Sequence, residues 1–249
     1  EAAALLEHSL RTRRDLLGRA RTGVSRDALQ RLSAPAPASP SPASSDSLRA
    51  IGDEVSACRL CANLAASRKH TVFGTGNQQA ELMFVGEAPG ADEDRAGEPF
   101  VGRAGELLTK IIGAMGLSRA DVYIANVLKC RPDTPPGASG NRPPNPSEIA
   151  NCLPYLRRQI AVIRPRVLVA LGKTAMAGLV GAEEPMAAMR GRWFEFENIP
   201  LLPTYHPSYL LRNGSNAEKR KVWEDMMLVM EKLGMPISAK QRGYFLSSN

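Results

Sequence analysis

The chain has 249 residues, 43% of them hydrophobic, and a formal net charge of +7 with an isoelectric point of about 9.5. No apolar run approaches the roughly 18 residues that a membrane-spanning helix needs, and no signal-peptide pattern stands near the start, so we expect a cytoplasmic protein. The basic excess continues beyond the first 47 residues, which favours a polyanionic partner for the folded part of the chain.

Residues 1–33 are predicted to form an N-terminal helical extension, because leucines recur there at near-helical spacing among Arg and Ala. A solvated or partner-docking helix is the first interpretation, and a nucleic-acid arm built on its arginines is the alternative. Residues 34–47 consist of Ala, Pro and Ser apart from Asp46, which is typical of a semi-extended linker.

We expect one folded domain over residues 48–235 and a C-terminal tail over 236–249. Ser47 is well placed to N-cap a helix over 48–60. Four apolar runs then alternate with helix-length stretches, the pattern of a parallel sheet covered on both faces. The chain is therefore predicted to be α/β, a three-layer αβα sandwich around a four-stranded parallel central sheet. The predicted strands are 81–87, 121–129, 167–172 and 199–205, and the predicted helices are 106–116, 147–163, 173–180 and 216–233.

The segment over residues 81–105 is where such a fold places a ligand site. A buried strand breaks at Gly86-Glu87-Ala88-Pro89-Gly90, and four acids, Phe100 and a Gly-Arg-Ala-Gly turn follow. Open α/β sheets bind ligands at the carboxyl ends of their strands. The turn carries neither GxGxxG nor GxxxxGK[ST], which argues against a nucleotide cofactor. Carboxylates beside an aromatic ring indicate instead a neutral planar ligand or acid–base chemistry.

Two more polar residues stand at strand ends. Asn126 interrupts an apolar run, and a buried amide must be satisfied internally or by a ligand. His206 follows the last strand, in His206-Pro207-Ser208. Because parallel strands end at one edge of the sheet, we expect both to converge with Glu87, although a structural role remains the alternative for each. The next three residues, 209–211, are placed in a loop from which an apolar side chain can wedge into a base stack.

The four cysteines comprise one CxxC pair and two distant residues: Cys58, Cys61, Cys130 and Cys152. Four thiolates suit either Zn²⁺ or an iron–sulfur cluster, and spacing does not separate the two. A zinc ribbon more often shows two CxxC pairs, which favours the cluster. Free buried cysteines are the alternative, and a redox CxxC would leave the other two unexplained.

Together these motifs resemble the family 4 uracil-DNA glycosylases, the iron–sulfur-containing group of the uracil-DNA glycosylase superfamily, over roughly residues 48–235. Residues 86–90 match the family's first motif, Asn126-Val127-Leu128-Lys129-Cys130 its middle segment, and His206-Pro207-Ser208 its second motif. Each motif alone is weak, but their joint order is highly specific.

The resemblance implies a DNA repair hydrolase that flips uracil out of single- or double-stranded DNA and hydrolyses its N-glycosidic bond, leaving an abasic site. Glu87 and His206 are then the expected catalytic residues, with His206 donating to uracil O2. The implied pocket consists of Glu87, Ala88, Pro89, the stacking ring of Phe100, Asn126 and His206. Leu210 is expected as the wedge in the DNA. A structural [4Fe–4S] cluster would be held by Cys58, Cys61, Cys130 and Cys152.

Ala88 stands where the superfamily's best-known branch has Asp, so Glu93 and Asp94 are candidates for activating water, with solvated surface acids as the alternative. We further expect a monomer associated with the nucleoid, with residues 1–47 available to a protein partner. A catalytically inactive iron–sulfur DNA-binding module and a glycosylase for another deaminated base, such as hypoxanthine, remain alternatives. Phosphate contacts are expected from among Arg131, Arg142, Arg190, Arg212, Lys219 and Arg220.

Overall fold

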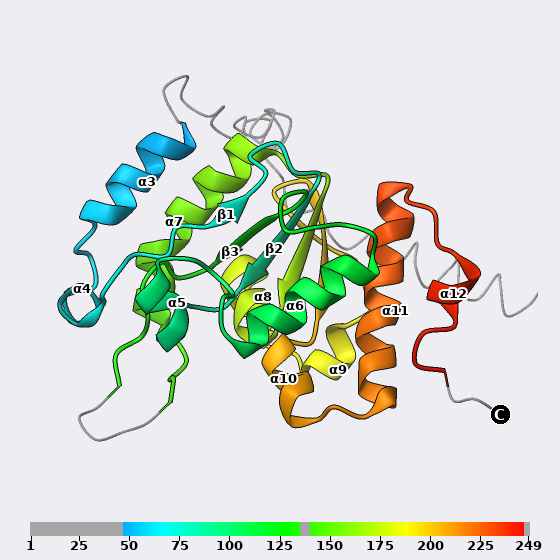
Figure 1. The fold of residues 1–249 in the computed structure, drawn as a ribbon. Coiled ribbons are helices and arrows are strands. Elements are labelled where there is room, and N and C mark those ends of the chain that lie inside the picture. Colours follow the sequence, from blue (N-terminus) through cyan, green and yellow to red (C-terminus); the bar gives the residue numbers. More distant parts are fainter. Residues whose placement is uncertain (1–46, 135–139, 247–249) are drawn as a thin grey trace, which may run out of the picture. The chain divides into compact units, whose positions relative to one another are not determined.

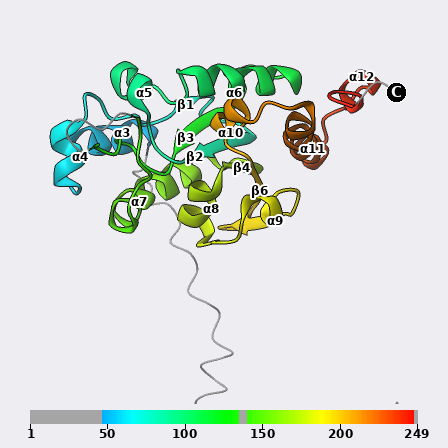
Figure 2. The ribbon, with the colours of Figure 1, turned by 90° about the horizontal axis from the view of Figure 1, so that it is seen from below.

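A six-stranded mixed sheet forms the centre of the computed structural model, which describes residues 47–134 and 140–246. Residues from Ser44 onward form one unit, and the predicted extension and almost all of the linker lie outside the described residues. The strand order is β1-β3-β2-β4-β6-β5 (Figures 1 and 2). The strands are β1 (Thr75–Gly76), β2 (Leu82–Gly86), β3 (Tyr123–Asn126), β4 (Val167–Leu171), β5 (Phe194–Phe196) and β6 (Ile199–Thr204).

The inner strands are apolar along their length because both faces of the sheet are covered. Their side chains alternate between two cores, as the period of two in a strand requires. In β2, for example, Leu82 and Phe84 belong to one core, whereas Met83 and Val85 belong to the other.

Helices cover the two faces separately (Figure 2). One face packs against α3 (Leu48–Ala57), α4 (Ala62–Ser67), α7 (Pro146–Ile163), α8 (Lys173–Val180) and α9 (Met186–Met189). The other packs against α6 (Arg103–Ala114) and α11 (Asn216–Leu233). The remaining helices of the described residues are short: α5 (Ala91–Ala96), α10 (Pro207–Arg212) and α12 (Ala239–Arg242). None of the helices in this part of the chain combines the length and apolarity needed to cross a membrane.

The three-layer α/β prediction is confirmed, but the predicted strand count was too low. The four predicted strands are the parallel ones, β3, β2, β4 and β6, and antiparallel β1 and β5 extend the sheet at its two edges. These edge strands have two and three residues, too few to show an alternating pattern. The predicted helix over 48–60 begins as expected, with the Ser47 hydroxyl accepting from Ala50 N at 3.1 Å. It ends at Ala57 because Cys58 adopts extended backbone.

Candidate active site

A large pocket opens at the carboxyl ends of the parallel strands. It surrounds about 1410 Å³ of empty space, the part open to solvent included. Three strands contribute the residues at or just beyond their ends: Glu87 after β2, Asn126 at the end of β3 and His206 after β6. All six residues expected around the bound ring line this one pocket: Glu87, Ala88, Pro89, Phe100, Asn126 and His206. The expected convergence at one sheet edge is therefore observed.

Asn126 is buried at the pocket wall, with 2% of its surface exposed. Its side-chain oxygen, Oδ1, has no hydrogen-bond partner among the described residues. Its backbone carbonyl accepts from the buried ammonium of Lys129 at 2.9 Å. A buried acceptor without a partner is costly, and at the pocket wall Oδ1 is free to accept from a donor on a ligand.

Phe100 places its ring against the imidazole of His206. The ring centroids are 5.6 Å apart and the planes are inclined by 31°. The backbone of Phe100 is left-handed, with φ of 55°, a region that aromatic residues rarely adopt. The pocket thus has an aromatic wall, held in place by a loop of unusual conformation.

His206 caps α10, and this fixes its protonation. The backbone N–H of Ser208 donates to Nδ1 at 3.1 Å, and the Ser208 hydroxyl lies 2.8 Å from the same atom. An atom that accepts from a backbone N–H carries no proton, so the neutral ring holds its proton on Nε2. Burial, with a smaller contribution from Arg212, lowers the pKa of His206 to about 4. Near neutral pH the imidazole is therefore an uncharged donor from Nε2.

The two acids that are candidates for activating water, Glu93 and Asp94, both accept hydrogen bonds from backbone amides. Glu93 lines the pocket, but its carboxylate accepts from the amides of Val101 and Gly102 at 3.1 Å each and from Gly90 N at 3.0 Å. Asp94 is buried and accepts from Lys69 N at 2.9 Å, outside the pocket. Glu87 is the remaining carboxylate among the described lining residues.

Residues 207–212 form a helix, α10, where we expected a loop. Ser208 and Arg212, one helical turn apart, both line the pocket. Leu210 lies on the opposite side of this helix and is 5% exposed, whereas Leu211 is 41% exposed. As the structure stands, the wedge residue that we expected is packed inside the protein, and its neighbour is the leucine that faces solvent.

Several pocket residues escaped the sequence analysis. Lys173 and Thr174 begin α8 directly after β4, at the same sheet edge where the other three parallel strands end.

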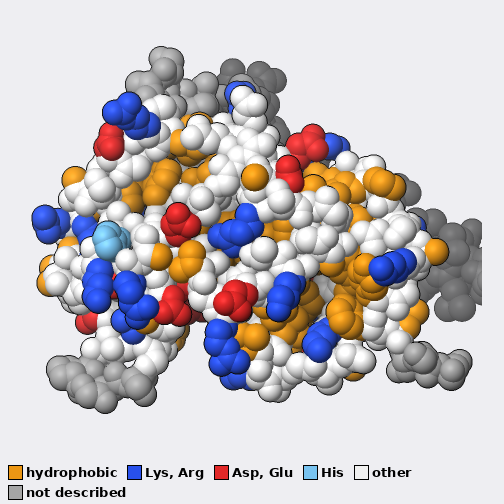
Figure 3. All heavy atoms as spheres, in the orientation of Figure 1, with side chains coloured by type: hydrophobic (Ala, Val, Ile, Leu, Met, Phe, Trp, Pro, Cys, Tyr) orange, Lys and Arg blue, Asp and Glu red, His pale blue; other side chains and the backbone are white. Residues whose placement is uncertain are grey.

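Basic side chains gather on the lower part of the face in Figure 3, where α6 and α10 lie in Figure 1. Four of the six expected phosphate contacts are engaged within the protein. Arg190 binds buried Asp225, and Arg220 donates to the carbonyls of Arg242 and Tyr244. Arg142 binds Asp133 and Glu148, and Arg131 donates to Asn141 and Gly140.

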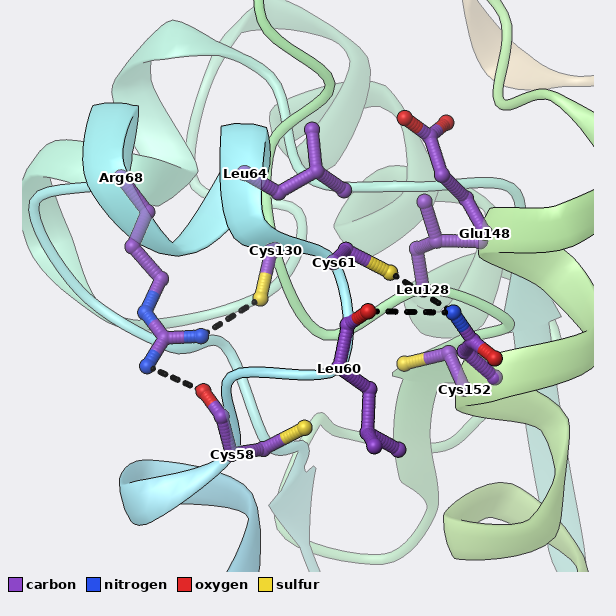
Figure 4. A pocket seen from close by; sticks show the side chains of 10 residues that line it. Cys58, Leu60, Cys61, Leu64, Arg68, Leu128, Cys130, Glu148 and Cys152 are labelled. Carbon is purple, nitrogen blue, oxygen red and sulfur yellow. Dashed lines mark hydrogen bonds between the residues drawn. The ribbon is translucent and has the colours of Figure 1, made fainter.

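A second pocket holds all four cysteines, which come from three separate parts of the chain. Cys58 and Cys61 flank the turn between α3 and α4, Cys130 follows β3, and Cys152 lies on α7. Their sulfurs surround one space (Figure 4), and the pocket encloses about 300 Å³ of empty volume, the part open to solvent included. All four are free thiols, so they are available as ligands.

Nitrogen donors already point at three of the four sulfurs. Arg68 Nη1 lies 3.1 Å from Cys130 Sγ, the backbone N–H of Lys129 donates to Cys152 Sγ at 3.1 Å, and Asn151 Nδ2 lies 3.5 Å from Cys61 Sγ. Burial raises the pKa of Cys152 to about 11 and also raises the pKa of Cys130, against the opposing effects of Lys129 and Arg68. Bound metal would supply the charge that keeps these thiols ionised.

Four cysteines that line one pocket are a ligand set for either Zn²⁺ or an iron–sulfur cluster. A single Zn²⁺ lies at about 2.3 Å from each sulfur, which requires the ligands to be closely gathered. Within residues 47–134 and 140–246, no three His, Cys, Asp or Glu side chains are placed to hold one metal ion. Hydrogen-bond donors on the sulfurs, as observed here, also accompany iron–sulfur clusters.

Comparison with known proteins gives a consistent result. Residues 73–227 match the model of the uracil DNA glycosylase superfamily. The chain is 44% identical to the Type-4 uracil-DNA glycosylase of Thermotoga maritima over 180 residues, covering 71% of this chain and 89% of that protein. It is 44% identical to the Type-4 enzyme of Saccharolobus solfataricus, covering 68% and 79%. The Type-5 uracil-DNA glycosylase of Pyrobaculum aerophilum is 33% identical, covering 54% and 64%.

Proposed function

We infer that this chain, which belongs to the Type-4 uracil-DNA glycosylases, removes uracil from DNA by hydrolysing the N-glycosidic bond and leaves an abasic site for repair. The observation that carries this inference is the buried, unpartnered Oδ1 of Asn126 in a pocket that also presents an aromatic wall and a neutral imidazole donor. A flipped uracil can donate its N3–H to Oδ1, stack its ring on the aromatic wall and accept a hydrogen bond from the imidazole at O2.

Base selection rests on Asn126. Uracil carries a proton on N3, which can donate to Oδ1, whereas cytosine has no N3 proton and would leave the buried oxygen unpaired. A site built to hydrogen-bond one substrate can reject an analogue that lacks the bond by about 10⁴–10⁵. The Phe100 ring supplies the stacking surface, and Ala88 and Pro89 complete the wall.

His206 is assigned to the uracil side of the glycosidic bond and Glu87 to the sugar side. As the glycosidic bond breaks, negative charge builds on uracil and positive charge on the sugar. His206 donates from Nε2 to uracil O2, and one donor aimed at a developing anion contributes about 2.7–4 kcal/mol. Glu87 faces the same pocket and is assigned to the sugar side, where its carboxylate favours the cation and orients the attacking water.

DNA is held through its phosphates and opened by an apolar side chain. Arg212 and Lys173 are exposed and line the pocket rim, where they can contact the backbone on either side of the flipped nucleotide. The wedge comes from α10. Leu210 requires this helix to shift before it can enter the stack, whereas Leu211 requires no such change. Both single- and double-stranded uracil-containing DNA are proposed as substrates.

A [4Fe–4S] cluster held by Cys58, Cys61, Cys130 and Cys152 has a structural role in this proposal. When bound, it supplies four metal–thiolate bonds that join the α3–α4 turn, the end of β3 and α7. The enzyme acts as a monomer in the cytoplasm, at the nucleoid. Its contact with a protein partner through residues 1–47 lies almost wholly outside the described residues.

The test is an excision assay on a duplex with one U·G pair, followed by alkali to cut abasic sites. We expect cleavage at the uracil, with strong loss in His206→Ala. DNA affinity without release of free uracil would favour the inactive DNA-binding module. Faster release of hypoxanthine than of uracil, in a substrate panel, would favour the glycosylase for another deaminated base.

A further inference from the structure

The loop that carries Phe100 is held from two sides by charged side chains. On one side, the guanidinium of Arg119 donates through Nη2 to Pro99 O at 2.8 Å and through Nη1 to Phe100 O at 3.2 Å. The planar fork of an arginine suits two neighbouring carbonyls, which an ammonium cannot span in the same way. Arg119 therefore fixes the carbonyl side of the left-handed residue.

On the other side, Glu93 Oε1 accepts from the next two amides, Val101 N and Gly102 N, at 3.1 Å each. One backbone group from each of the four residues 99–102 is thus bound by two side chains of opposite charge. Gly105 lies against the same loop, and a Cβ there would stand 1.7 Å from Phe100 O. The loop has no room to relax on that side, so the clamp and the close packing together impose the left-handed backbone.

We propose that Arg119 and Glu93 are positioning residues that hold the Phe100 ring in the orientation that stacks on the flipped base. The inference rests on the proposed function, because it gives Phe100 its role. Arg119 is not among the residues that line the active pocket; it borders a separate open cavity with Thr75, Asn77 and Glu98. Any effect on the base must therefore pass through the groups that it binds, which are the carbonyls of Pro99 and Phe100 and, at 3.4 Å, the Thr109 hydroxyl.

The experiment is a double-mutant cycle on the full-length protein, with the dissociation constant of free uracil as the readout alongside kcat and KM. Arg119→Met is expected to weaken uracil binding about 10-fold and to lower kcat as the ring loses its orientation. In a Phe100→Ala background, the same substitution is expected to change uracil binding less than 2-fold. Arg119→Lys, which keeps the charge but not the fork, should fall between Arg119→Met and wild type.

A matched control separates positioning from general stability. Arg220 also donates to two carbonyls, Arg242 O at 2.7 Å and Tyr244 O at 2.9 Å, and does not line the pocket. Arg220→Met is expected to lower the melting temperature without changing uracil affinity. Because the cavity beside Arg119 is open, millimolar methylguanidinium should restore uracil binding to Arg119→Ala, whereas equal sodium chloride should not.

Each contrary outcome has its own meaning. Additive losses from Arg119→Met and Phe100→Ala would overturn the clamp and leave the proposed function intact. A Phe100→Ala enzyme that binds uracil normally would overturn both the stacking role and the clamp. If the wild type releases no uracil from DNA, the proposed function itself fails. Should Arg119→Met not fold, the Lys variant decides the question: uracil affinity equal to that of the wild type would overturn the clamp.

Discussion

Gly86 and Asn126 are register partners on neighbouring parallel strands, and a Cβ at Gly86 would stand 2.3 Å from Asn126 Oδ1. The same Cβ would lie 2.6 Å from the Phe100 ring. The missing side chain at position 86 therefore leaves the space in which the amide and the aromatic wall meet.

Gly86→Ala should consequently impair the active site more than the fold. Overpacking costs about 1–3 kcal/mol in the free energy of unfolding, and displacing Oδ1 should lower kcat/KM for uracil at least 10²-fold. A Cβ at Gly113, in α6, would meet no atom within 4 Å, so Gly113→Ala serves as the control. That variant should be more stable by about 0.5–1 kcal/mol and fully active. Equal activity of the two variants would contradict the assignment.

Asn126→Ala should lose uracil recognition, because the acceptor for N3–H is removed. We expect free uracil to raise the melting temperature of the wild type but not of this variant, and excision to fall at least 10²-fold. Gln159 provides the comparison, since its Oε1 is also buried without a partner but lies outside the pocket. Gln159→Ala should alter stability and leave the uracil-dependent shift in place. A uracil-dependent shift that survives in Asn126→Ala would rule out the proposed contact.

The pH profile should report the neutral state of His206. With its pKa lowered to about 4, the ring stays uncharged as pH falls from 8 to about 5, so excision should be level over that range with respect to this group. Below this range, protonation of Nδ1 displaces the Ser208 N–H bond, and the rate should fall as pH passes through 4. His206→Gln, whose amide donates without titrating, should be slower and lack that acid limb. A wild-type midpoint near 6.5 would show an ordinary histidine instead.

Glu148→Gln tests the wall that the two pockets share. Glu148 lines the cysteine pocket and binds Arg142, which lines the active pocket, at 2.7 and 2.9 Å. Arg142 also binds Asp133. The hydrogen bonds that Glu148 accepts from Arg142 hold the pKa of Glu148 below its usual range. Since Arg142 is partly exposed, we expect a loss of about 1–3 kcal/mol in stability and a raised KM, with iron content unchanged. Lost iron with normal KM would place the role of Glu148 at the cysteines alone.

Comparing variants of two neighbouring leucines shows which side chain inserts into the base stack of DNA. Leu210→Ala should lower the free energy of unfolding by about 2–5 kcal/mol, because the side chain is 5% exposed. Leu211→Ala should barely affect stability, since the side chain is 41% exposed. If Leu211 enters the stack without movement of α10, its loss should slow excision from duplex DNA more than from single strands. Strand-selective loss in Leu210→Ala alone would instead show that α10 shifts on DNA.

Much of the fold was predictable because the inner strands and long helices carry strong patterns. The continuous apolar runs of β2 and β4, for example, reflect a sheet buried on both faces. The short elements were missed, since two or three residues carry no period. In the site, strand ends identified Glu87, Asn126 and His206. The hydrogen bonds from Val101 N and Gly102 N to Glu93 were not predictable, because they depend on how the irregular loop after α5 folds back on that helix.

In the proposed function, the ring nitrogen of His206 that caps the first turn of α10 also decides which nitrogen carries the proton that is donated to uracil. Chemistry and helix initiation therefore share one contact, at the start of a helix of six residues. Short helix ends are among the first places to fray on warming. Fraying there would free the imidazole to exchange tautomers while the sheet is still intact. On heating, the enzyme should therefore lose its activity at a lower temperature than that at which the fold melts.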